Sequence, residues 1–99
     1  MTVPITAMVT LYIAPEHREA FLEALHGLLP QARQEPGCHF VHAHEVADEP
    51  GTFVLLEHWR DLEEYRDEVL QKDYFTAYLA ASEAMYAKPR VITMLNPID

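Results

Sequence analysis

Two residues near the middle of the chain, Glu57 and Trp59, combine a carboxylate with the largest aromatic side chain. They lie two positions apart in the segment 52–60, where residues alternate in the period-two pattern of a β-strand. Both side chains therefore point to the same face. Such a pair can form the floor of a small apolar pocket with one polar group. The alternatives are that Trp59 only packs in the core and that Glu57 makes a structural ion pair.

The chemistry that this pair offers is proton transfer in a site that excludes water. Burial disfavours the charged form of a carboxylate, so it would raise the pKa of Glu57 and make the group a stronger base. A base of this kind can take a proton from a weakly acidic group of a bound ligand. We therefore treat Glu57 and Trp59 as the candidate catalytic residues.

Five further residues are candidates for the substrate pocket. Tyr65, Tyr74 and Phe75 lie in helical segments, where the tyrosines can place hydroxyls at a pocket edge or simply pack in the core. His42 and His44 lie two apart on one face of a strand, as at a pocket rim or a dimer surface. The two histidines could also bind a metal, but no further ligand stands at a distinctive spacing, so we predict no metal site.

These residues need a scaffold, and periodicity supplies its elements. Alternating patterns predict strands over 3–13, 38–46, 52–60 and 90–95. Helical spacing predicts helices over 15–34, 61–70 and 73–88, of which the last two can be capped by Asp61 and Asp73. The residues Asp48-Glu49-Pro50-Gly51 have turn composition, so the second and third strands should form an antiparallel hairpin. The order predicts an α+β fold, the ferredoxin-like split βαβ sandwich with a four-stranded antiparallel sheet.

The predicted strand at 3–13 carries no charged residue on either face. A strand of this kind is expected to be covered on both sides. Helices can cover only one side of the predicted sheet. We therefore expect a second copy of the chain to cover the other side, giving a homodimer that packs through its sheet faces.

Composition bounds the remaining possibilities. Ninety-nine residues suit one domain, residues 1–99, and 16 acidic against 7 basic residues give a net charge of −9, which repels nucleic acid and anionic membranes. The chain has one cysteine, no apolar run long enough to cross a bilayer, and no signal-peptide pattern, so we expect a cytoplasmic protein. Its three glycines form no phosphate-binding loop, which argues against a nucleotide cofactor.

Three motifs together resemble the antibiotic biosynthesis monooxygenase family over nearly the whole chain: Glu35-Pro36-Gly37-Cys38, Glu57-His58-Trp59-Arg60-Asp61 and Tyr74-Phe75. The resemblance implies a dimeric α+β barrel with a pocket between the sheet and the helices of each subunit. It also implies cofactor-independent oxidation of a small quinol, polyphenol or polyketide-type aromatic by O2. A small-molecule isomerase, a haem or ligand binder, and a non-catalytic dimerisation module remain alternatives on the same scaffold.

The chain departs from the family pattern at positions that bear on cofactors. Val69 and Tyr74 stand where relatives commonly carry histidine, and no histidine follows His58. The haem-degrading branch takes its iron ligand from this helical region and uses an asparagine of the first strand, and the chain has neither residue. We therefore expect no haem and no other cofactor.

Overall fold

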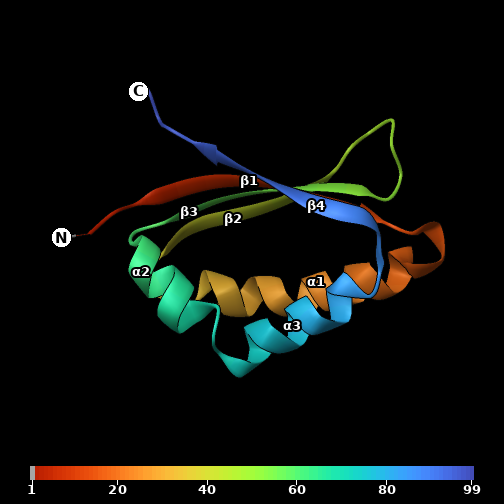
Figure 1. The fold of residues 1–99 in the computed structure, drawn as a ribbon, viewed down its shortest axis with the longest axis horizontal. Coiled ribbons are helices and arrows are strands. Elements are labelled where there is room, and N and C mark those ends of the chain that lie inside the picture. The colour runs from red at the N-terminus through yellow and green to blue at the C-terminus, as the bar shows by residue number, and fades with distance from the viewer. Residues whose placement is uncertain (1) are drawn as a thin grey trace.

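The computed structural model describes residues 2–99 as a four-stranded antiparallel sheet with helices on one side (Figure 1). The strands are β1 (Ile5–Ile13), β2 (Cys38–Glu45), β3 (Thr52–Trp59) and β4 (Tyr86–Leu95). The helices are α1 (Arg18–Arg33), α2 (Leu62–Glu64) and α3 (Asp73–Glu83). The sheet order β2-β3-β1-β4 confirms the predicted α+β, ferredoxin-like arrangement.

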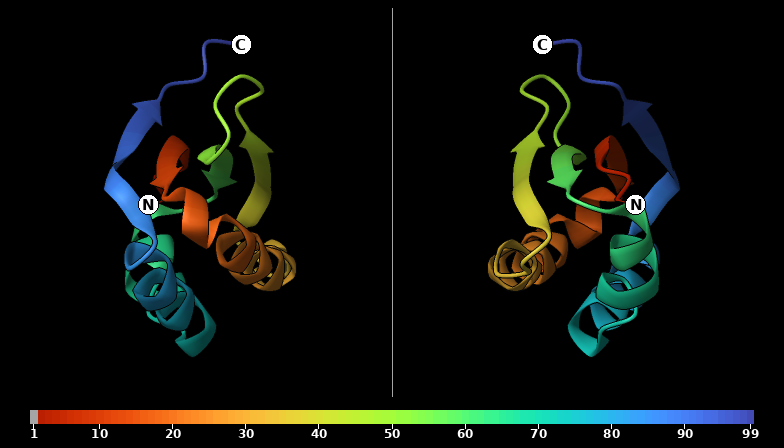
Figure 2. Two further views of the ribbon diagram at one scale, coloured as in Figure 1. Left: turned by 90° about the vertical axis from the view of Figure 1, so that its right-hand side faces the viewer. Right: turned by 90° about the vertical axis from the view of Figure 1, so that its left-hand side faces the viewer.

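The helices α1 and α3 pack against each other and against one face of the sheet. Figure 2 shows both on the same side, with β2 and β4 at the two edges of the sheet. Among the described residues, no helix is both long and apolar enough to span a membrane.

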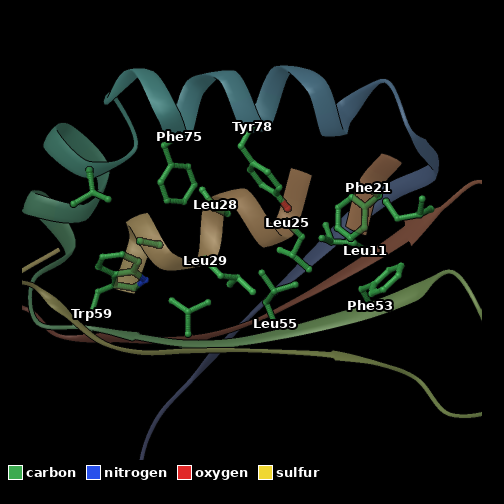
Figure 3. Close-up of a cluster of buried hydrophobic side chains, with 14 residues drawn as sticks. Leu11, Phe21, Leu25, Leu28, Leu29, Phe53, Leu55, Trp59, Phe75 and Tyr78 are labelled. Carbon is green, nitrogen blue, oxygen red and sulfur yellow. The ribbon is translucent and has the colours of Figure 1, made fainter. Parts of the chain in front are cut away.

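The core lies between this face of the sheet and the helices. Leu11, Phe53 and Leu55 project from the strands, as their alternation predicts, and meet the apolar stripe of α1 (Figure 3). The ring of Phe21 is fully buried, with its centroid 4.9 Å from that of Phe53. Burying a phenylalanine side chain contributes about 2–3 kcal/mol, so this contact anchors α1 to the sheet.

The turn between β2 and β3 confirms the predicted antiparallel hairpin. Gly51 closes it with φ +93°, a conformation that side chains disfavour. Its carbonyl accepts a hydrogen bond of 2.8 Å from the backbone nitrogen of Ile13, and a Cβ on Gly51 would lie 2.9 Å from the Ile13 oxygen. Glycine is therefore required here by both conformation and space.

The segment after β3 starts as predicted and then changes its winding. The Asp61 carboxylate caps α2 by accepting a hydrogen bond of 3.2 Å from the Glu64 backbone nitrogen. Residues Tyr65–Val69 then form a π-helical turn, in which the backbone nitrogen of Leu70 donates to the carbonyl of Tyr65 at 2.9 Å. Turns of this kind are rare and often occur at functional sites.

The boundary between α3 and β4 differs from the sequence prediction. α3 ends at Glu83, and residues 86–88, which we predicted to be helical, belong to β4. Pro89 lies inside the strand because β4 is an edge strand, where a missing N–H costs little. Asp73 also does not cap α3, because Lys72 occupies the capping position and makes no side-chain bond there.

β2 breaks its alternation at the first residues. Cys38 pairs with Trp59 and Phe40 pairs with His58, which leaves His39 as an extra residue in the strand. Simple alternation along the predicted strand 38–46 would place Cys38 and Phe40 on one face, and this prediction is wrong because of the extra residue. Cys38 packs against the core, whereas Phe40 stacks on His58 on the other face of the sheet.

Candidate functional site

A cavity of about 220 Å³ lies between the sheet, α1 and α3. Its walls are mostly aliphatic and aromatic side chains from β1, β3, β4 and the helices. Of residues 2–99, only two charged ones, Glu57 and Arg90, line it. An apolar cavity with few polar groups is the usual form of a small-molecule site.

Trp59 and Phe75 face each other across one end of this cavity. Figure 3 shows Trp59 pointing from the end of β3 toward the helices, while Phe75 and Tyr78 point from α3 toward the sheet. The ring of Tyr65 lies between them, with its centroid 4.7 Å from that of Trp59 and 6.4 Å from that of Phe75. Trp59 is 1% exposed, so the core interpretation and the pocket interpretation both hold for this residue.

The carboxylate of Glu57 is buried in this aromatic cluster, with the residue 8% exposed. One of its oxygens, Oε1, accepts hydrogen bonds from Trp59 Nε1 at 2.8 Å and from the Tyr65 hydroxyl at 3.3 Å. The other, Oε2, has no hydrogen-bond partner among residues 2–99. Because no fully buried side-chain oxygen of these residues lacks a partner, Oε2 keeps some accessible surface. The alternative of a structural ion pair is wrong for the described residues, since no cation contacts Glu57.

The surroundings shift the titration of Glu57 toward that of a base. Burial raises the pKa of the Glu57 carboxyl above its usual value, and the hydrogen bonds from Trp59 and Tyr65 offset only part of this effect. The pKa of the Tyr65 hydroxyl is also raised, by its own burial and by the nearby charge of Glu57. Tyr65 therefore stays protonated and acts as a donor to Glu57.

The structure brings four of the predicted site residues to the cavity: Glu57, Trp59, Tyr65 and Phe75. It separates His42 and His44 from them. These histidines pair across the sheet with Leu56 and Val54, so they lie on the opposite face from the core.

Tyr74 lies beside the cavity and faces another carboxylate. Its ring centroid is 5.7 Å from that of Phe75, and its hydroxyl donates to Glu35 Oε2 at 2.6 Å. Glu35 also accepts two hydrogen bonds from Lys72 Nζ, at 2.7 and 2.9 Å. Tyr74 and Lys72 therefore form a hydrogen-bond network with Glu35 that connects the turn before β2 to the start of α3.

Sequence reasoning missed Arg90 as a lining residue. The alternation of Arg90, Ile92 and Met94 in the predicted last strand puts all three on one face, and all three line the cavity. The pattern does not reveal which face of the strand meets the core. That depends on how β4 pairs with β1, which no local pattern encodes.

The donor atoms of the cavity bear on cofactors. Along residues 2–99, no histidine or cysteine lines it, so a haem iron would find no such ligand there. Over the same residues, histidines, cysteines and carboxylates form no cluster of three or more suited to a metal. What the cavity offers is one carboxylate, one guanidinium and aromatic hydroxyl and indole donors in an apolar space.

Comparison with known proteins places the chain in context. Residues 4–81 match the family model described as antibiotic biosynthesis monooxygenase. Among solved structures, Rv0793 from Mycobacterium tuberculosis is 27% identical, with a TM-score of 0.87 over 98% of this chain and 97% of that one. PA3566 from Pseudomonas aeruginosa is 26% identical, with a TM-score of 0.87 over 100% and 98% of the two chains.

A curated relative is similar along most of the chain. The uncharacterized protein sll1783 of Synechocystis is 28% identical over 89 residues, which make up 90% of this chain. The match spans only 60% of the length of that relative.

Proposed function

This chain belongs to the antibiotic biosynthesis monooxygenase family, and we propose on that basis that it is a monooxygenase that needs no cofactor. Its substrate is a small quinol, polyphenol or polyketide-type aromatic, which binds in the cavity and reacts there with O2. The observation that carries the proposal is the buried Glu57, held by Trp59 and Tyr65 with one oxygen free in an apolar cavity.

The reaction obtains all its electrons from the substrate. A quinol and O2 give a hydroxyquinone and water: one oxygen atom enters the ring, the other leaves as water, and the quinol is oxidised to the quinone. The chain has to remove a phenolic proton, because the resulting anion is the species that passes electrons to O2. It also has to keep water away from the anion and from the reactive oxygen adduct.

Glu57 is the base in this scheme. Its raised pKa increases its proton affinity, and its free Oε2 is the atom that takes the phenolic proton. Once protonated, the same carboxyl can return the proton to the outer oxygen of the substrate peroxide, giving a hydroperoxide. Loss of the proton on the carbon that bears the hydroperoxide then forms the C=O bond and breaks the O–O bond, and the departing hydroxide takes up that proton and leaves as water. The hydrogen bonds from Trp59 and Tyr65 to Oε1 hold the carboxyl in position without occupying Oε2.

We also propose that the protein acts as a homodimer through the open face of its sheet. The side chains of β1 and β3 on this face include no Asp, Glu, Lys or Arg, although the chain has a net charge of −9. They are Thr6, Met8, Thr10, Tyr12, Thr52, Val54, Leu56 and His58. Figure 1 shows no helix over this face, and a second copy would remove its apolar groups from water.

Oxygen consumption tests the enzymatic proposal directly. Metal-free and flavin-free protein should consume O2 with at least one member of a panel of hydroquinones, naphthalenediols and anthrones. With ¹⁸O-labelled O2, one labelled atom should appear in the organic product. Glu57→Gln keeps the shape of the side chain but removes the base, so kcat should fall about a hundredfold or more. The matched control is Glu68→Gln, which removes the same charge from an exposed position and should retain full activity.

Two results would contradict this proposal. One is the absence of protein-dependent O2 consumption with every substrate of the panel. The other is a Glu57→Gln variant as active as the original protein.

A further inference from the structure

Arg90 is an exposed cation of β4 that lines the cavity and has no side-chain partner among residues 2–99. Over residues 2–99, it makes no hydrogen bond or ion pair, whereas each of the other six lysines and arginines contacts a carboxylate, a backbone carbonyl or an aromatic ring. A guanidinium has five N–H donors in a planar fork that fits carboxylates. An unpaired one beside a cavity is therefore available to a ligand.

The pairing of β4 with β1 directs Arg90 into the cavity. Thr10 pairs with Val91 and Tyr12 pairs with Lys88, so the register shifts by one residue between these pairs. On the near side of this shift, Val9 pairs with Ile92 on the core face of the sheet, and alternation places Arg90 on the same face. Arg90 lies at the shift and lines the cavity, as do Ile92 and Met94 further along β4.

The two charged residues of the cavity stay apart. Arg90 and Glu57 form no ion pair, which means that more than 4.0 Å separates their charged atoms, yet the positive charge of Arg90 helps to hold down the pKa of Glu57. The cavity thus has a base in one part of its wall and a free cation in another. Most other residues that line the cavity are apolar, which suits the ring of a ligand that reaches both charged groups.

We propose that Arg90 is an anion-binding residue of this cavity and that the ligand is a small aromatic compound with one carboxylate or similar anionic group. The proposal rests on the cavity being the substrate site of the function proposed above. The aromatic rings of the ligand lie against the apolar wall, and its anionic group pairs with Arg90. The phenolic hydroxyl that loses its proton in the proposed reaction faces Glu57 Oε2. An apolar cavity of about 150 Å³ accommodates benzene, so about 220 Å³ fits one or two fused rings.

The net charge of the protein bears on how a preference for anionic over uncharged ligands could arise. At −9 the chain as a whole repels anions, and a preference for an anionic ligand must therefore come from a local group. Arg90 is the only cation that lines the cavity along residues 2–99. Removing its charge should thus abolish the preference.

Binding of a non-reactive ligand pair tests the proposal without any need for catalysis. The pair is 2-naphthoate and its uncharged amide, 2-naphthamide, at low salt. The signal is quenching of the fluorescence of Trp59, which is the only tryptophan and lines the cavity. Arg90→Gln should weaken naphthoate binding about tenfold, the loss expected for one charge-assisted hydrogen bond, and should leave naphthamide binding unchanged.

The control variant is Lys88→Gln. It removes the same charge from the same strand, but Lys88 lies over the ring of Tyr12 at 4.1 Å and does not line the cavity. It should bind both ligands as the original protein does. Far-UV circular dichroism should show both variants folded, because Arg90 makes no hydrogen bond whose loss could unfold the chain.

Three outcomes would overturn the proposal. They are no binding of naphthoate, equal affinities of the original protein for naphthoate and naphthamide, and equal losses of naphthoate affinity in Arg90→Gln and Lys88→Gln.

Oxygen consumption separates this proposal from the enzymatic proposal on which it rests. If the enzymatic proposal fails, no dihydroxynaphthalene is oxidised, but the effect of Arg90→Gln on naphthoate binding persists. If only the anion proposal fails, uncharged and carboxylated dihydroxynaphthalenes are oxidised equally well and Arg90→Gln changes neither rate.

Discussion

The hydrogen bond between Trp59 and Glu57 should stabilise the fold in a way that depends on the charge of Glu57. Trp59→Phe tests this, because it keeps an aromatic ring against Tyr65 and removes the indole N–H that donates to Oε1 at 2.8 Å. A hydrogen bond to a charged group is worth about 1.5–3 kcal/mol, and the lost indole area and the cavity left behind add about 1–2 kcal/mol. We expect the free energy of unfolding to fall by about 3–4 kcal/mol at pH 8.

A double-mutant cycle isolates the charged part of this effect. In a Glu57→Gln background the carboxamide oxygen can still accept from the indole, but this neutral hydrogen bond is worth only about 0.5–1.5 kcal/mol. Trp59→Phe should therefore cost about 1–2 kcal/mol less in that background. Urea denaturation at fixed protein concentration measures all four variants.

The pH dependence of the same cycle provides an independent check. The pKa of Glu57 is raised in the folded protein, so folding favours its protonated form. The stability linked to this group is fully present below the usual carboxyl pKa near 4.5 and is lost as the pH rises through the raised pKa of the folded state. Glu57→Gln should thus be more stable than the original protein at pH 8, and this advantage should disappear toward pH 4.

Additive effects of the two substitutions, within about 0.5 kcal/mol at pH 8, would refute the reasoning. So would a coupling that stays the same at pH 4 and pH 8. Either result would mean that the indole packs against Glu57 without stabilising its charge. The carboxyl would then lack the support that the proposed base requires.

Two more predictions concern the scaffold. Glu35→Gln should lower the free energy of unfolding by about 1–3 kcal/mol at pH 7, because Lys72 and Tyr74 lose a charged acceptor. Burial opposes ionisation of Glu35, but the hydrogen bonds from Lys72 and Tyr74 outweigh burial and lower the pKa of Glu35. Thermal melts should therefore show a smaller loss of stability in Glu35→Gln as the pH falls below about 4.5. An equal loss at pH 3 would contradict the assignment. Leu56→Glu places a charge on the open face of the sheet and should give a monomer in sedimentation velocity. The control Leu56→Thr should remain a dimer. If the original protein is a monomer, the proposed dimer is ruled out.

Much of the fold could be predicted because its signals are local. The strand at Ile5–Ile13 follows a period-two pattern, and the turn that ends at Gly51 contains the one residue type that its backbone angle favours. The carboxylate of Asp61 caps the helix that follows β3, as the sequence predicts. The errors lie where longer-range pairing overrides local preference, as at Pro89, which breaks a helix in isolation but is accommodated in the edge strand β4.

The candidate site was predictable only in part. Glu57 and Trp59 share a face because they are two residues apart on a strand, and this relation follows from backbone geometry alone. The histidines at positions 42 and 44 share a face for the same reason, but that face is turned away from the helices. Alternation thus establishes which residues share a face of a strand, but it leaves open which of the two faces packs against the helices.

The sequence by itself determined the order of the elements, the hairpin and the neighbouring positions of Glu57 and Trp59, since each depends on residues close together in the chain. Only the tertiary structure decided that the Tyr65 hydroxyl reaches Glu57 and that Arg90 lines the same cavity. Tyr65 opens the π-helical turn that follows β3, and Arg90 reaches the cavity because β4 pairs with β1 so that Val9 lies opposite Ile92. The pairing of β4 with β1 joins segments distant in sequence, and this long-range packing leaves no periodic signal in the chain.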